Sequence, residues 1–339
     1  MTGGGLHALD PVIAPRFRFD PQARIATMGS CFAQHISRDL AAHGIEPFVA
    51  EPGPDGLDQA ERRRRGYGVF SARYGNVYTV RQAVQLMRRA FGKFDPEDDA
   101  WLRDDRWVDP FRPTVEPDGF PTRKAMRADR KQHLAATRAV VSMCDVLVLT
   151  LGLTVAWRSR IDGAVFSLAP GVAGGSFDPE RHEFVNFGVS ETIDDLGRFA
   201  RAFHKRNPTG CILLTVSPVP LVATFEDRHV LVSTVESKAI LRAAAGEIVR
   251  RHAFVDYFPS FEIITATGND RYFGDDFRTV TEAGVDHVMR IFRRHYLGMG
   301  KAATVAPQSP AVPEDDIICD EAEIAASLSG QDRRGQALR

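Results

Sequence analysis

The sequence predicts an α/β protein with a doubly wound, mostly parallel sheet and helices on both faces of that sheet. Two short runs, 146–151 (VLVLTL) and 211–216 (CILLTV), are apolar throughout, which is typical of parallel strands covered on both sides. Helical patterns separate these runs from each other and from a further short strand at 24–28. Strands that alternate with helices in this way favour parallel pairing with crossover helices.

The N-terminal part begins with the strand at 24–28, which runs into Gly29. A helix follows, with Phe32, Ile36 and Leu40 on one apolar face. Downstream, the pattern predicts a short strand at 47–49, a loop rich in Gly, Pro and charge at 51–66 and a helix from Thr79 to Phe91. Residues 101–111 are expected to be irregular or a small hairpin, and a long helix follows at 122–143.

The C-terminal part begins with the strand at 146–151 and continues into a hairpin at 157–166, with Asp162-Gly163 at its turn. The remaining elements are helices at 191–206, 233–251 and 280–296 and strands at 211–216 and 254–257. The hairpin and residues 51–120 are insertions into the sheet. Residues 1–297 are therefore expected to form a single domain. Residues 298–339, rich in Ala, Pro and acidic side chains, are expected to form a mostly disordered tail.

Composition narrows the classes of function. The 339 residues carry a formal net charge of −1, so no global charge attracts nucleic acid. No apolar stretch approaches the roughly 20 residues that span a bilayer, and no secretory signal is visible. The four cysteines are scattered without C-x-x-C spacing, which argues against a metal site or a disulfide framework. We expect a cytoplasmic protein with a small-molecule or glycan substrate and an oligomeric state that the sequence leaves open.

The turn Gly29-Ser30-Cys31 is the candidate site of chemistry. In open α/β sheets, ligands bind beyond the carboxyl ends of the strands, and this turn joins such an end to a helix. The free N–H groups of the helix N-terminus favour negative charge, lower the pKa of a thiol and can form an oxyanion hole. Cys31 or Ser30 is the nucleophile in this hypothesis. In the alternative, Cys31 is a small buried side chain that only packs.

The pentapeptide at 29–33 resembles the GSCFA family, and several later motifs resemble it in the same order. These motifs are YGNVYT at 74–79, LTLGLT at 149–154 with Trp157, TVSPV at 215–219, SKAIL at 237–241 and DYFPS at 256–260. The family is similar to the SGNH/GDSL esterases and acyltransferases. The resemblance implies a three-layer α/β/α, flavodoxin-like fold and chemistry on an acyl ester of a carbohydrate or similar small substrate. It implies no cofactor for an esterase, and CoA or another acyl donor for an acyltransferase.

The resemblance also implies roles for single residues. An ungapped match to the Gly-Asp-Ser of the SGNH relatives puts Cys31 at the nucleophile position, and a shift by one residue puts Ser30 there. The relatives end in Asp-x-x-His, but here Asp276 is followed by Thr279. Their base cannot be carried over, and Asp276 is left to orient another base or to hold Arg278.

Two histidines are candidates for the missing base. His35 lies one helical turn after Cys31 and is the first of them. His229 follows the strand at 211–216 and is the second, whereas His287 lies inside the last helix and is expected to pack there. If neither histidine has a catalytic role, His35 is expected to be an exposed helical residue and His229 an ordinary loop residue.

Further residues would bind substrate or complete the oxyanion hole: Gly29, Gly75, Asn76, Gly152 and Thr154. For each of them, tight-turn geometry is the plain alternative. Because the usual histidine is missing, a second hypothesis stands beside the enzyme. In that hypothesis the chain is a catalytically degenerate binding protein that holds a CoA-like or glycan ligand in the same crevice.

Overall fold

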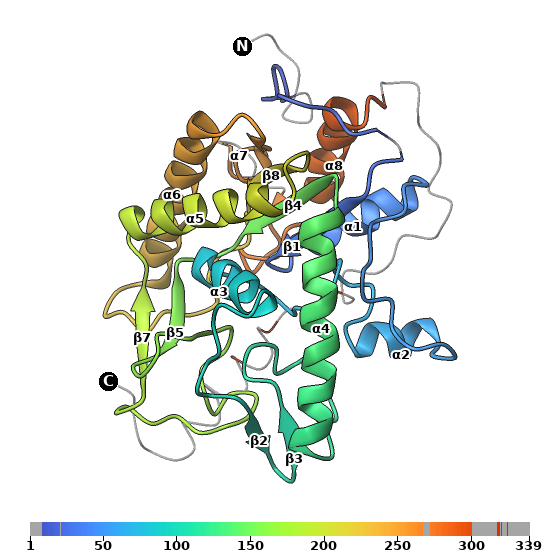
Figure 1. Cartoon of the computed structure of the whole chain (residues 1–339). Coiled ribbons are helices and arrows are strands. Elements are labelled where there is room, and N and C mark those ends of the chain that lie inside the picture. The colour runs from blue at the N-terminus through green and yellow to red at the C-terminus, as the bar shows by residue number, and fades with distance from the viewer. Residues whose placement is uncertain are drawn as a thin grey trace.

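A parallel sheet forms the centre of the molecule. The computed structural model describes residues 9–20, 22–266, 272–299, 317, 318, 320 and 324. Within these residues the sheet has the order β1-β4-β8-β9, and all neighbouring strands are parallel (Figure 1). The strands are β1 (Ile25–Gly29), β4 (Val146–Leu151), β8 (Cys211–Val216) and β9 (Val255–Tyr257). The four predicted strands of the sheet are thereby confirmed.

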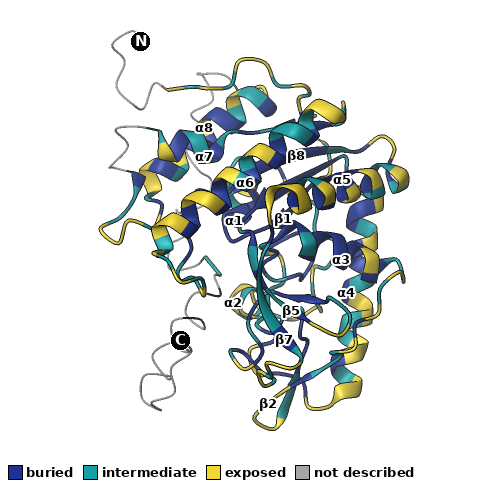
Figure 2. Ribbon diagram, turned by 90° about the vertical axis from the view of Figure 1, so that its left-hand side faces the viewer, coloured by how far each residue is buried: buried dark blue, intermediate teal, exposed yellow. Residues whose placement is uncertain are grey.

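Helices cover both faces of this sheet, so the three-layer fold is confirmed. Alternate residues of β4 show it, since Leu147 and Leu149 pack into one core and Val146 and Val148 into the other. Figure 2 shows the buried strands between the two helical layers. The first core packs against α3 (Val80–Ala90), α4 (Arg123–Met143), α5 (Val189–Arg206) and α6 (Val230–Arg251). The second packs against α1 (Ala33–Ala42), α7 (Ser260–Thr265) and α8 (Glu282–Tyr296).

Two small antiparallel sheets are inserted into this frame. One is the hairpin of β2 (Trp101–Arg103) and β3 (Arg106–Val108). The other has the order β6-β5-β7, in which the predicted pairing of Trp157 with Phe166 is confirmed. Gln85 of α3 joins this sheet to the main body, because its side chain donates to Gly163 O at 2.7 Å and accepts from Val165 N at 2.8 Å. The strands are β5 (Val155–Ser159), β6 (Val165–Phe166) and β7 (His182–Asn186).

Two local predictions were wrong. No strand forms at 47–49, where a proline removes one donor and the Phe48 N–H donates a single bond to Ile25 O, at 2.9 Å. The segment 51–66, expected to be a loop, contains the helix α2 (Gln59–Arg64). The side chain of Asp58 caps the N-terminus of this helix by accepting a hydrogen bond from Glu61 N.

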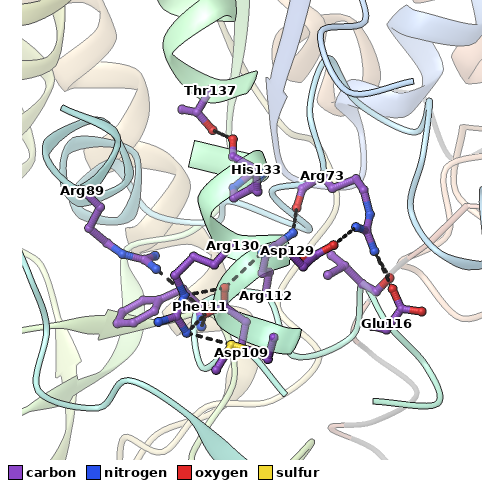
Figure 3. Close-up of polar contacts among 12 residues, drawn as sticks. Arg73, Arg89, Asp109, Phe111, Arg112, Glu116, Asp129, Arg130, His133 and Thr137 are labelled. Atoms are coloured by element: carbon purple, nitrogen blue, oxygen red, sulfur yellow. Dashed lines mark hydrogen bonds and ion pairs between the residues drawn. The ribbon is translucent and has the colours of Figure 1, made fainter. Parts of the chain in front are cut away.

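A buried network of ion pairs fixes the segment that leads to Gly75 and Asn76. The side chain of Arg73 is fully buried and donates to Asp129 and Glu116, both at 2.8 Å. The neighbouring guanidinium of Arg112 donates to Asp129 at 2.5 Å and to Asp109 at 3.1 Å (Figure 3). Burial opposes ionisation of Asp109, but the charges of Arg130, Arg112 and Arg89 outweigh it and hold the pKa of this carboxyl far below its usual range.

His133 lies in the same network and makes folding sensitive to pH. Its Nδ1 lies 3.0 Å from Glu51 Oε2, and burial together with the charge of Arg112 lowers its pKa to about 4. Between pH 6.5 and pH 4, His133 is therefore protonated in the unfolded chain but stays neutral in the folded protein. Stability from this histidine is complete above pH 6.5 and is lost as the pH falls toward 4.

We expect the free energy of unfolding to fall by about 2 kcal/mol between pH 7 and pH 5 on account of this one side chain. Urea unfolding at several pH values measures it. The free energy of unfolding should depend less on pH in His133→Gln than in the wild type. An equal dependence on pH in that variant would contradict the assignment.

Candidate active site

The turn after β1 requires glycine at its first position. Gly29 has φ +135°, and a Cβ atom there would lie 2.2 Å from the carbonyl oxygen of Thr150. Thr150 is its register partner on β4, so the close approach follows from the strand pairing itself. The backbone of the turn is therefore fixed by the sheet, and Ser30 and Cys31 are presented at the sheet's carboxyl edge.

The entry into α1 leaves amide donors at this turn. Ser30 N donates to Thr150 O at 3.2 Å, and Gln34 N donates to Cys31 O at 3.0 Å. The N–H groups of Cys31 and Phe32 donate to no residue that the structure describes, and no side chain caps this helix. Free N–H groups at a helix start stabilise developing negative charge. The predicted oxyanion donor of Ser30 is thus engaged, whereas that of Cys31 is available.

Both candidate nucleophiles line one cavity. Ser30 and Cys31 are 3% and 5% exposed and lie in its wall beside Gly152 and Ser217. These residues follow β1, β4 and β8, so the cavity lies where the carboxyl ends of three parallel strands meet. The Ser30 hydroxyl is buried and has no hydrogen-bond partner among the residues that the structure describes. A buried hydroxyl without a partner is costly, which marks this point as one where a ligand atom would be favoured.

A lysine completes this cavity. Lys238 of α6 is 1% exposed, lines the cavity with Cys31, and donates from Nζ to Gly152 O at 2.8 Å. Burial lowers its pKa to about 7, against the opposing effect of charge on Cys31. A lysine with such a pKa is partly neutral at physiological pH and can accept a proton. The site thus pairs a thiol with an amine that can act as a base.

The sequence contained a signal for Lys238 that remained unused. Lys238 belongs to the SKAIL motif, to which no role was assigned. On a helix, positions 234, 238, 241, 245 and 248 lie on one face, and all five are buried in α6. A lysine on the apolar face of a helix is seldom buried without a function, because its charge must be desolvated.

The histidines proposed as bases lie elsewhere. His35 is on α1, its pKa is lowered to about 4 by burial, and it packs against Phe32 with ring centroids 5.3 Å apart. His229 caps α6, where its Nδ1 accepts from Leu231 N at 3.2 Å. Neither is among the described residues that line the cavity. His287 is buried in α8, between the Tyr272 hydroxyl at 2.5 Å and Leu9 O at 2.8 Å, as a packing residue would be.

Asp276 closes a local turn and does not line the cavity among the described residues. Its carboxylate accepts from the Thr279 hydroxyl at 2.6 Å and from the N–H groups of Arg278 and Thr279, both at 2.9 Å. These hydrogen bonds, with that of the Thr279 hydroxyl foremost, lower the pKa of this carboxyl. The structure therefore gives Asp276 a turn-forming contact with Thr279.

The remaining predicted oxyanion residues are largely engaged by protein. Gly152 N donates to Tyr78 O at 3.2 Å. Thr154 donates from its hydroxyl to Asn186 Oδ1 at 2.7 Å, and its N–H donates to Ser237 Oγ at 3.0 Å. Asn76 is buried, and its amide donates to Ile318 O and to Asp320. Gly75 has φ +68°, which a tight turn before Asn76 requires.

Two further findings concern ligands of other kinds. Within the described ranges, no group of His, Cys, Asp and Glu side chains is arranged to hold a metal ion. Among those same residues, no helix is long and apolar enough to cross a bilayer.

Comparison with known proteins supports the family resemblance. A model of the GSCFA family matches residues 24–292. No curated protein matches the chain. Among solved structures, a carbohydrate esterase family 2 enzyme with a carbohydrate binding domain, from Corynascus thermopiles (Myceliophthora fergusii), aligns at 12% identity with a TM-score of 0.30. That alignment covers 86% of this chain and 69% of the other.

Proposed function

Since the chain belongs to the GSCFA family over residues 24–292, we propose that it is an SGNH-like esterase or acyltransferase. Its substrate in this proposal is an acyl ester of a carbohydrate or similar small molecule. One observation carries the proposal: Cys31 and Lys238 line the same cavity at the carboxyl edge of the sheet, with Ser30 between strand and helix. A nucleophile and a base in one desolvated cavity are what acyl transfer needs.

The proposed steps assign each proton. Neutral Lys238 accepts the proton of the Cys31 thiol, and the thiolate sulfur attacks the ester carbonyl carbon. The oxyanion that forms is stabilised by the free N–H groups of Cys31 and Phe32. The carbon–oxygen bond to the alcohol then breaks, and the leaving alkoxide takes the proton back from Lys238. Water, or the hydroxyl of an acceptor, then attacks the thioester carbonyl carbon and gives its proton to Lys238. The carbon–sulfur bond breaks, the acid or new ester leaves, and the Cys31 thiolate takes that proton back from Lys238.

Ser30 is the alternative nucleophile. Cys31 is favoured because a thiol loses its proton far more readily than a serine hydroxyl and is the stronger nucleophile. In an acyltransferase, CoA or another acyl donor would supply the thioester or ester that Cys31 attacks. We also propose a cytoplasmic location, which agrees with free thiols at Cys31, Cys144 and Cys211.

Trapping of the acyl-enzyme tests the function. With p-nitrophenyl butyrate we expect a burst of nitrophenol, and a mass increase of one butyryl group on the peptide that contains Cys31. Cys31→Ala should lower turnover by about a thousandfold or more and abolish the adduct. Ser30→Ala should retain the adduct. An adduct on Ser30, or turnover that survives in Cys31→Ala, would contradict Cys31 as the nucleophile.

A binding protein remains the second candidate, and one observation favours it. Asp276 and Thr279, which stand where the relatives have their Asp-x-x-His, bond to each other and do not line the cavity among the described residues. In that case the crevice holds a CoA-like or glycan ligand without turnover. Stoichiometric binding of CoA, measured by calorimetry, in a protein that shows no acyl-enzyme with any ester would favour this candidate over the enzyme.

A further inference from the structure

The cavity beside Cys31 is polar at one end and apolar over most of its wall. Its polar side chains gather around Ser30, Cys31, Ser217 and Lys238. Apart from the hydroxyl groups of Tyr78 and Ser167, the rest of the described wall is apolar, and most of it comes from β5, β7 and the segments at 167–172 and 219–225. Lys238 is the single charged side chain among the described lining residues, and none of them is an acid or an amide.

Three aromatic rings close the far side of the cavity. The ring centroids of Trp157 and Phe225 are 4.9 Å apart, those of Phe184 and Phe225 are 5.6 Å apart, and those of Trp157 and Phe184 are 5.8 Å apart. Phe225 is 42% exposed, so this cluster reaches from the cavity to the surface. The described wall offers few hydrogen-bond partners for the many hydroxyls of a sugar, since it has no acid, amide or guanidinium group. An apolar chain would instead remove this wall from water.

We propose that the cavity takes an apolar acyl chain of medium length, with the carbonyl at Cys31 and the chain along Trp157, Phe184 and Phe225. This inference rests on the proposed function, and it assigns the cavity to the acyl part of the ester. The alcohol part, sugar or otherwise, then lies outside the cavity. Each methylene buried in such a wall stabilises the bound state by a nearly constant amount until the space is filled.

A chain-length series tests the inference. For p-nitrophenyl esters from acetate to dodecanoate, kcat/KM should rise about fourfold with each added methylene and then level off. Ala223→Trp, which places a large ring in the wall, should lower kcat/KM for the octanoate ester much more than for the acetate ester. The matched control is Ala135→Phe on the exposed face of α4, which should change neither.

The two proposals fail in different ways. Turnover through Cys31 with no dependence on chain length would overturn the acyl-chain inference and leave the esterase standing. Absence of all turnover would overturn the esterase. Calorimetry on Cys31→Ala with octanamide and acetamide then decides the inference: binding of octanamide alone supports it, and equal or absent binding of both overturns it.

A second inference rests on separate contacts, made by the C-terminal segment. Gln34 of α1 is 1% exposed, and its side chain makes two hydrogen bonds to the backbone of Ile318. Its Nε2 donates to Ile318 O at 2.8 Å, and its Oε1 accepts from Ile318 N at 3.1 Å. The side chain of Asn76 donates to the same carbonyl at 3.3 Å. Two buried amides that converge on one peptide unit form a clamp for an extended chain.

The same clamp holds an acidic side chain. Asp320 is 2% exposed, and its carboxylate accepts from Asn76 Nδ2 at 3.1 Å and from the Thr114 hydroxyl at 3.0 Å. Its N–H donates to the Tyr78 hydroxyl at 3.4 Å. Beyond it, Ile324 donates from N to Asp320 O at 3.2 Å and lines the cavity together with Cys31.

We infer that Ile318, Asp320 and Ile324, here called the tail latch, close the active site of the resting protein. Asn76, a predicted oxyanion donor that is not among the described residues lining the cavity, gives its amide to the latch. Ile324 at the same time occupies part of the apolar wall. The described side chains therefore form a binding surface for an Ile-x-Asp segment, and the chain's own tail is its occupant.

Two truncations test the latch. A chain that ends at residue 299 removes it, and a chain that ends at residue 325 keeps all three residues as the matched control. Alkylation of Cys31 by iodoacetamide, followed by peptide mapping, should be about tenfold faster or more in the shorter chain and unchanged in the longer one. A synthetic peptide of residues 317–325 should restore the slow rate.

A point variant keeps the test independent of truncation. In the full chain, Asp320→Ala should raise the alkylation rate of Cys31, whereas Asp55→Ala, at an exposed position before α2, should not. Equal rates in both truncations, or no effect of Asp320→Ala, would overturn the latch. Because alkylation requires no substrate, these outcomes do not depend on the esterase or on the acyl-chain inference.

Discussion

Replacement of Lys238 by methionine is expected to lower kcat/KM for ester cleavage by about 10²- to 10⁴-fold, the range that removal of a general base produces. The amine of Lys238 lies in the cavity of Cys31, and its pKa is lowered to about 7 by burial. A base must be neutral to accept the thiol proton, so activity of the wild type should rise with pH through about 7 and then level off. In Lys238→Met this rise should be absent.

Two variants separate the base from a purely electrostatic role. Lys238→Arg keeps the positive charge but cannot lose its proton, so it should be as inactive as Lys238→Met. The matched control is Lys205→Met at the exposed end of α5, which should leave the pH profile unchanged. Full activity in Lys238→Arg would show that charge suffices and that Lys238 is not the base. Thermal unfolding of each variant checks that the fold is kept.

Arg73→Met is expected to lower the free energy of unfolding by about 3–5 kcal/mol, the usual cost of removing one partner from a buried ion pair. Arg73 is fully buried, and its guanidinium donates to Asp129 and Glu116 and to the carbonyl oxygens of Arg65 and Val115. Methionine fills a similar volume but leaves both carboxylates with fewer donors in a site with little water. Urea unfolding of the variant measures the effect.

The surface offers a matched control for Arg73. Arg64 also pairs with two carboxylates, Glu61 and Asp118, but its side chain is 44% exposed. Water solvates those charges when the arginine is removed, so Arg64→Met should lower the free energy of unfolding far less than Arg73→Met does. A small effect at both positions would contradict the view that burial, and not the number of partners, sets the cost.

The main sheet could be predicted because its strands are encoded locally. The runs 146–151 and 211–216 match β4 and β8 residue for residue, since continuous apolar side chains at this length fit a strand buried on both faces. The strand β7 (His182–Asn186) was not predicted. Its residues include the polar His182 and Glu183, and they form a strand because they pair with β5, which is distant in the sequence.

The site could be predicted only in part, for a similar reason. The turn at 29–31 could be predicted, because the strand, the glycine and the start of the helix are adjacent in the sequence. Lys238 reaches Gly152 from 86 positions away, and Asp320 reaches Asn76 from 244 positions away. Such contacts depend on how helices and tail pack, which periodicity does not encode.

The small sheet of β5, β6 and β7 is separate from the main sheet and is inserted between β4 and α5. It contributes Trp157 and Phe184 to the cavity wall and contacts α3 through Gln85, whereas Cys31 and Lys238 come from α1's turn and α6. Reactive groups and recognition surface are thus held by different pieces of chain. Exchange of residues 155–186 would therefore alter Trp157 and Phe184 in the wall while leaving the turn at 29–31, Lys238 and the wall segment at 219–225 untouched.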